Sequence, residues 1–127
     1  MSTYEVSVQG VFHAGHSVRL PDGSCEPPHE HDWQVTATFR ANRLDETMGV
    51  VVDFLEVESS LQAVMAQLEG KDLNSLAAFS DGRPSAERVA EHVAKALAFR
   101  LGGDHRLYRL AVTEAPGCGA AYYPNGA

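Results

Sequence analysis

Trp33-Gln34-Val35-Thr36-Ala37-Thr38-Phe39 alternates apolar with polar residues, and this period of two predicts a half-buried β-strand. The preceding residues, His29-Glu30-His31, continue the same parity, because His31 lies two positions before Trp33. Side chains two positions apart on a strand project from the same face, so both histidines could converge on one ion. A lone His-x-His pair is more often a surface feature, and residues elsewhere in the chain must decide between these interpretations.

The composition is typical of one globular domain spanning residues 1–127, with 44% hydrophobic and 21% charged residues. The net charge of −7 argues against a nucleic-acid partner, because phosphate binding requires a basic surface. The sequence shows neither a signal peptide nor an apolar run of membrane-spanning length, so we expect a cytoplasmic protein without a membrane partner. In that reducing compartment, Cys25 and Cys118 are expected to be free thiols.

A first strand is predicted over residues 4–12, where apolar side chains occupy even positions and Gly10 is expected to mark a β-bulge. A loop rich in Pro and Gly then leads to the His-x-His strand. Antiparallel pairing of the two strands would bring His16 close to His29 and His31.

Two amphipathic helices are predicted after this strand pair. The first is capped by Asp53, carries apolar residues at spacings of three and four, and ends before Gly70. The second is capped by Ser85. Two further strands are predicted over residues 107–114 and 120–123.

The order ββααββ predicts an α+β fold in which a four-stranded antiparallel sheet carries two helices on one face. The second face and the two edges of such a sheet remain open. We therefore expect a homo-oligomer, because self-association would bury both.

Three histidines gathered from two neighbouring strands, His16, His29 and His31, suggest a zinc site with an open fourth position, which is the catalytic arrangement. Neutral imidazoles leave the ion its full charge for polarising a substrate oxygen. We expect only structural roles for the other histidines, which are His13, His92 and His105.

Over nearly its whole length the chain resembles the 6-pyruvoyltetrahydropterin synthase family, which includes the 6-carboxytetrahydropterin synthases of queuosine biosynthesis. The order and spacing of several motifs carry the resemblance: Phe12-His-Ala-Gly-His16, Cys25-x-x-x-His29-x-His31, Gly49-Val-Val-Val-Asp53-Phe54, Asp72-Leu73-Asn74, Pro84-Ser85-Ala-Glu87 and Thr113-Glu114.

The resemblance implies a tunnelling fold (T-fold), in which three subunits close a β-barrel and two such rings stack as a hexamer with sites at subunit interfaces. It implies zinc held by His16, His29 and His31, and a pterin bound at Thr113-Glu114. Glu114 would anchor the amino-pyrimidine edge through charge-assisted hydrogen bonds. The implied activity is that of a lyase of tetrahydrobiopterin or queuosine biosynthesis.

The chain departs from the family pattern at its expected catalytic triad. A cysteine matching Cys25 is activated in the family by an aspartate and a histidine, and here Glu69 and Gly70 occupy those two positions. Without a cationic neighbour a thiol is mostly protonated at neutral pH, so Cys25 and Glu69 form an incomplete triad. Glu30 replaces the glycine usual between the two histidines and would alter either the metal charge balance or the choice of substrate.

Three hypotheses follow. The first is a zinc-dependent lyase acting on the side chain of 7,8-dihydroneopterin triphosphate or a related pterin, with the triad incomplete. The second is a non-catalytic pterin-binding homologue. The third is a small metal-binding barrel of cupin type, which the two helices between the strand pairs argue against.

Overall fold

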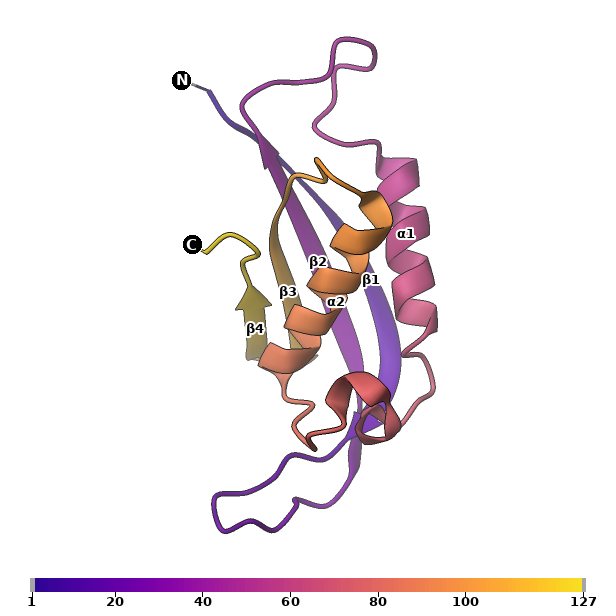
Figure 1. Cartoon of the computed structure of the whole chain (residues 1–127), viewed down its shortest axis with the longest axis vertical. Helices are drawn as coiled ribbons and strands as arrows, with labels where there is room; N and C mark the ends of the chain where they lie inside the picture. The colour runs from indigo at the N-terminus through magenta and orange to yellow at the C-terminus, as the bar shows by residue number, and fades with distance from the viewer. Residues whose placement is uncertain (1, 127) are drawn as a thin grey trace.

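The computed structural model describes residues 2–126, which form an antiparallel sheet covered on one face by two helices (Figure 1). The strands lie in the order β1-β2-β3-β4, and short 3-10 turns at Leu73–Ser75 and Ala77–Phe79 connect the helices. The longer elements are β1 Tyr4–His16, β2 His29–Ala41, α1 Phe54–Ala66, α2 Ala86–Leu101, β3 Leu107–Ala115 and β4 Cys118–Tyr122. The predicted fold class and element order are confirmed.

The core lies between the sheet and the helices. Phe12 of β1 and Trp33 of β2 are direct partners in the ladder, and their rings stack with centroids 5.9 Å apart. The helices bury their apolar stripes against this layer, through Val57, Leu61, Val64 and Met65 of α1 and Val89, Ala90, Val93, Ala94 and Leu97 of α2. Removing these side chains from water is the main favourable contribution to folding.

Both predicted helix caps are present. The side chain of Asp53 accepts a hydrogen bond of 3.0 Å from the backbone N–H of Leu55, and Ser85 accepts one of 3.2 Å from Arg88. Each bond satisfies an N–H group that the first turn of a helix leaves free. The Ser85 cap also fixes the preceding residue, Pro84, whose carbonyl contacts the candidate site.

Gly10 does not form the expected β-bulge, because the β1–β2 register runs without interruption and pairs Gly10 with Val35. The reason for glycine is packing against α1. A Cβ atom at this position would lie 2.3 Å from Cε and 2.8 Å from Sδ of Met65. The missing side chain therefore makes room for a buried methionine.

The last strand begins earlier than predicted, at Cys118 rather than at residue 120. Pro116 and Gly117 form a two-residue hairpin turn, and Ala115 pairs directly with Cys118. Gly117 has a φ of 81°, which glycine adopts without strain. The strand can therefore start immediately after the turn.

The face of the sheet away from the helices carries polar side chains and an exposed Val11. Among residues 2–126, no helix combines the length and apolarity needed to cross a membrane.

Candidate metal centre

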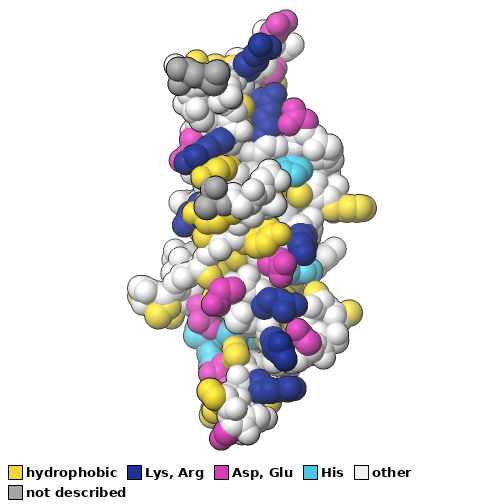
Figure 2. All heavy atoms as spheres, turned by 60° about the vertical axis from the view of Figure 1, so that its left-hand side comes forward, with side chains coloured by type: hydrophobic (Ala, Val, Ile, Leu, Met, Phe, Trp, Pro, Cys, Tyr) yellow, Lys and Arg dark blue, Asp and Glu magenta, His cyan; other side chains and the backbone are white. Residues whose placement is uncertain are grey.

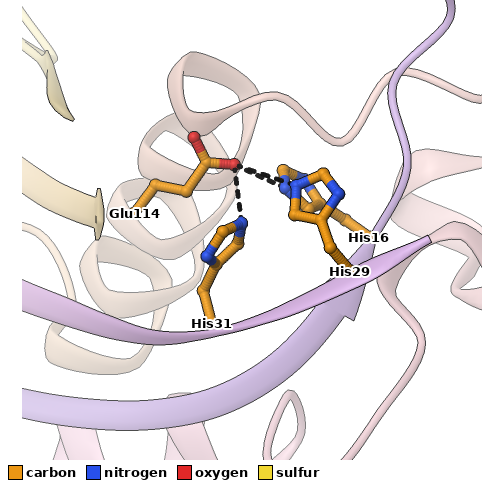
Figure 3. A group of neighbouring side chains, drawn as sticks. All are labelled: His16, His29, His31 and Glu114. Atoms are coloured by element: carbon orange, nitrogen blue, oxygen red, sulfur yellow. Dashed lines mark ion pairs between the residues drawn. The ribbon is translucent and has the colours of Figure 1, made fainter. Parts of the chain in front are cut away.

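Three histidines and one glutamate meet where β1 ends and β2 begins (Figure 3). The β1–β2 register pairs His16 with His29 and Ala14 with His31. Because residues two apart on β2 share a face, His29 and His31 both lie beside His16. Glu114 comes from β3, directly after Thr113, which pairs with Gln34 of β2.

The potential ligand atoms of these residues all lie within 4.8 Å of one another. Oε1 of Glu114 lies 2.5 Å from Nε2 of His16, 3.4 Å from Nε2 of His31 and 3.9 Å from Nε2 of His29. His16 is the most enclosed, with 1% of its side chain exposed. The cluster is compact enough for one ion to reach every side chain.

The hydrogen bonds behind the rings fix which nitrogen faces the centre. Nδ1 of His16 donates to the carbonyl of Pro84 at 2.7 Å, and Nδ1 of His29 donates to that of Pro27 at 3.1 Å. In the neutral tautomer Nε2 then carries the lone pair, and an outer hydrogen bond of this type is a regular feature of metal-binding histidines.

The inward-facing nitrogens point to a missing partner. Nε2 of His16 and Nε2 of His31 are buried, and neither makes a hydrogen bond of acceptable geometry with any of residues 2–126, despite the nearby Glu114 oxygen. Buried polar atoms normally have partners. The donor set, three imidazoles and a carboxylate, suits zinc or another transition metal.

The electrostatics also favour a cation. Burial lowers the pKa of His31, although the carboxylate of Glu114 opposes the shift. The ring of His31 is therefore neutral at physiological pH and binds a metal ion without first losing a proton.

The surrounding residues hold the ligands in place. Nε1 of Trp33 donates to the carbonyl of Ala14 at 3.1 Å, and the indole ring lies edge-on to His16 with centroids 4.9 Å apart. The side-chain amide of Asn74 bonds to the backbone N–H and C=O of Ser17 at 2.8 and 2.9 Å. The backbone is thus held on both sides of His16, at Ala14 and at Ser17.

Two open pockets flank the cluster. The Lys71 pocket, of about 450 Å³, is lined by Gly15, His16, Pro28, His29, Glu30, Gly70, Lys71 and Asp72. The Thr113 pocket, of about 500 Å³, is lined by Glu30, His31, Asp32, Gln34, Thr113, Glu114, Ala115 and Pro116. Each pocket includes ligands of the cluster, and Glu30 lines both.

The structure places the expected catalytic residues outside the cluster. Cys25 is exposed in the β1–β2 loop, where its backbone pairs with that of Arg19. Both carboxylate oxygens of Glu69 lie 3.3 Å from the backbone N–H of His13, and Glu69 lines neither pocket. Neither Cys25 nor Glu69 therefore belongs to the cluster of possible metal ligands, and their catalytic roles stay a prediction.

Two features were missed by sequence reasoning. Oε1 of Glu26 lies 3.7 Å from Nε2 of His29, and it accepts a hydrogen bond of 2.9 Å from the backbone N–H of Val18. Its position three residues before His29 was the one sequence feature that could have suggested this contact. The second is the setting of His13, whose ring contacts two acidic side chains.

That ring lies between Asp32, 2.8 Å from Nδ1, and Glu30, 3.1 Å from Nε2. These hydrogen bonds, first to Asp32 and then to Glu30, raise the pKa of His13. No sequence pattern pointed to the group, because it depends on the register that pairs His13 with Asp32.

Several solved structures with the same architecture are described as 6-pyruvoyl tetrahydropterin synthases. The Caenorhabditis elegans 6-pyruvoyl tetrahydropterin synthase is 17% identical, with a TM-score of 0.84 over 97% of this chain and 96% of that one. The Plasmodium vivax enzyme is 17% identical, with a TM-score of 0.75 over 96% of this chain and 98% of that one. A Plasmodium vivax variant described as a catalytic residue mutant, with a glutamate replaced by alanine, gives a TM-score of 0.69 at 15% identity over 96% of this chain and 98% of that one.

No protein of curated function matches the sequence significantly. The family model for 6-pyruvoyl tetrahydropterin synthase, however, matches residues 5–125, which is nearly the whole chain. The chain therefore belongs to the 6-pyruvoyl tetrahydropterin synthase family.

Proposed function

We propose that the protein is a zinc-dependent lyase that acts on the side chain of 7,8-dihydroneopterin triphosphate or a related pterin. The observation that carries the proposal is the convergence of His16, His29, His31 and Glu114, whose ligand atoms lie within 4.8 Å of one another. The family supports a pterin as the substrate class.

The three histidines would hold the ion through Nε2, with their outer hydrogen bonds keeping the rings oriented. A zinc ion bound there supplies a Lewis acid that polarises a carbonyl or hydroxyl oxygen. The burial of His16 keeps bulk water away from one side of the centre, while both pockets leave access for a substrate.

Thr113 and Glu114 would bind the pterin ring. Both line the Thr113 pocket, whose volume lies within the range of small-molecule sites. The carboxylate of Glu114 can accept two hydrogen bonds from an amino-pyrimidine edge. In this role Glu114 turns from the histidines toward the pocket and leaves the fourth metal position open.

Proton transfer would use the loop before His29. Cys25 is the expected thiol, and Glu26 is a carboxylate already positioned 3.7 Å from His29. A glutamate is described as a catalytic residue in the Plasmodium vivax synthase, which supports a carboxylate in such a role. Glu69 would need to leave the His13 backbone to take part.

We further propose that the chain functions as a homo-oligomer, as a trimer or a hexamer with sites at subunit interfaces. The open sheet face and the two edge strands, β1 and β4, support this assembly. A neighbouring subunit could then complete either pocket.

The second candidate is a pterin-binding protein without synthase activity. The observation that favours it is Gly70, which stands where the family histidine is expected and cannot activate Cys25. This candidate predicts pterin binding through Glu114 without product.

The test is turnover of 7,8-dihydroneopterin triphosphate by protein of known zinc content, with the product identified by mass. We expect product that disappears when zinc is removed and falls at least a hundredfold in Cys25→Ala or Glu26→Gln, since lost acid–base groups cost that order of rate. Pterin binding without product would instead support the second candidate. Undiminished turnover without zinc would refute the metal-dependent mechanism.

A further inference from the structure

The possible metal ligands are divided between the two pockets that flank them. His16 and His29 line the Lys71 pocket, whereas His31 and Glu114 line the other. Figure 3 shows the same division, with His16 and His29 at one side of the group and Glu114 at the other. The metal centre therefore lies between the pockets, and a ligand that extends from one pocket into the other must pass it.

The proposed substrate has a matching shape. The pterin ring and the triphosphate of 7,8-dihydroneopterin triphosphate lie at opposite ends of a short hydroxylated side chain. With the ring in the Thr113 pocket beside Glu114, the side-chain hydroxyls would reach the metal centre and the triphosphate would extend into the Lys71 pocket. That pocket, of about 450 Å³, is open and lies within the size range of small-molecule sites.

Lys71 supplies the positive charge that a triphosphate requires. Among the described residues that line either pocket, it is the one Lys or Arg. Its side chain is exposed and takes part in none of the ion pairs within residues 2–126. An ammonium group donates charge-assisted hydrogen bonds to phosphate oxygens. The side chain of Lys71 is therefore available to an anionic ligand.

The carboxylates that line the same pocket have partners of their own. Oε1 of Glu30 lies 3.1 Å from Nε2 of His13, whose raised pKa favours a charged ring beside it. Oδ1 of Asp72 accepts a hydrogen bond of 3.1 Å from the backbone N–H of Asn74. Each carboxylate therefore has a partner other than Lys71.

We propose that Lys71 binds the triphosphate of the substrate, which lies across the metal centre with its pterin ring in the Thr113 pocket. The inference rests on the proposed function and assigns a separate subsite to each end of the substrate. Fixing both ends would hold the side-chain hydroxyls at the metal centre, so that less entropy is lost when the reacting groups meet.

The arginines near the site are the alternative partners for the triphosphate. Figure 2 shows a column of Lys and Arg side chains beside the histidines, on the lower part of the face it presents. Arg83 directly precedes Pro84, whose carbonyl accepts a hydrogen bond from His16, but it lines neither pocket. Its side chain is exposed, as is that of Lys71. Arg83 is therefore a matched control, because it has the same charge and lies outside the proposed subsite.

The test measures dissociation constants of 7,8-dihydroneopterin and of its triphosphate for the zinc-loaded full chain, at low and high salt. We expect Lys71→Gln to weaken binding of the triphosphate compound about tenfold and to leave binding of dihydroneopterin unchanged. Lys71→Arg should retain the affinity, because it keeps the charge, and Arg83→Gln should match wild type. The wild-type preference for the triphosphate compound should fall as the salt concentration rises.

Three outcomes would overturn the role of Lys71. One is equal binding of both compounds by wild type, and another is an equal loss for both in Lys71→Gln, which a disturbed fold or metal centre would produce. The third is a selective loss in Arg83→Gln without one in Lys71→Gln, because the triphosphate would then lie outside the Lys71 pocket.

Product formation tests the lyase proposal separately. If the triphosphate compound binds without giving product, the lyase proposal fails, and the selective loss in Lys71→Gln still decides the role of Lys71. If neither compound binds, both proposals are overturned.

Discussion

Replacing Asn74 with alanine should weaken both the fold and the metal centre, because this side chain closes the end of β1. Its Oδ1 accepts from the N–H of Ser17 at 2.8 Å, and its Nδ2 donates to the C=O of Ser17 at 2.9 Å. The side-chain amide thus makes the same pair of hydrogen bonds with Ser17 that a neighbouring β-strand would make.

The expected loss is worked from those two bonds. Each hydrogen bond contributes about 0.5–1.5 kcal/mol net, so Asn74→Ala should lower the free energy of unfolding by about 2 kcal/mol. At an m-value of about 2 kcal/mol/M, this moves the urea midpoint by about 1 M. Looser placement of His16 should also weaken zinc binding about tenfold, as loss of a supporting contact often does.

The assay is urea unfolding of metal-free protein, followed by zinc competition with a chelator of known affinity. The control is Asn42→Ala, which removes an exposed hydrogen bond to Thr3 and should change stability by less than about 0.5 kcal/mol. An Asn74→Ala midpoint equal to that of Asn42→Ala would refute the reasoning. Asn74→Asp adds a second check, because it keeps the acceptor but loses the donor.

Gly10→Ala should cost about 1–3 kcal/mol by urea unfolding, since its Cβ would meet Met65 at 2.3 Å. A Met65→Val partner change should recover part of that loss, and simple additivity of the two variants would contradict the packing explanation. Burial lowers the pKa of His92 below the unfolded value of about 6.5, so between these two values the unfolded chain binds more protons. Wild type should therefore lose more stability than His92→Gln as the pH falls from 7.5 to 5, and equal losses would rule out this contribution of His92.

The sheet and the helices could be predicted because their signals are local. The alternation around Val35 and the caps at Asp53 and Ser85 each depend on a few neighbouring residues, and the structure has them as expected. Gly10 was misinterpreted for the same reason. Its role depends on Met65, which is far away in the sequence and close only after α1 packs on β1.

Predicting the histidine cluster also required the pairing of β1 with β2. Parity alone placed His31 on the face of Trp33, but only the register that pairs His16 with His29 brings the third imidazole to the same point. A shift of one residue would have turned His16 to the other face. The antiparallel pairing predicted from the sequence brought the three histidines near one another, but it did not specify this register.

The position of Glu114 depends on still more distant features. Its strand, β3, pairs with β2 but follows it in the chain only after both helices. The β2–β3 ladder also contains an irregularity between Thr38 and Phe39 that shifts the register. No local pattern encodes such a shift, so the contact of Glu114 with all three imidazoles could not be predicted.

The contact of Glu114 with the three imidazoles gives its carboxylate two competing uses. As a fourth ligand it would close the coordination shell, and as a pterin anchor it would leave one position open, which is the arrangement that catalytic zinc requires. If Glu114 serves both uses, metal binding and pterin binding would be coupled through this one side chain, and the free energy of each would depend on which partner Glu114 faces.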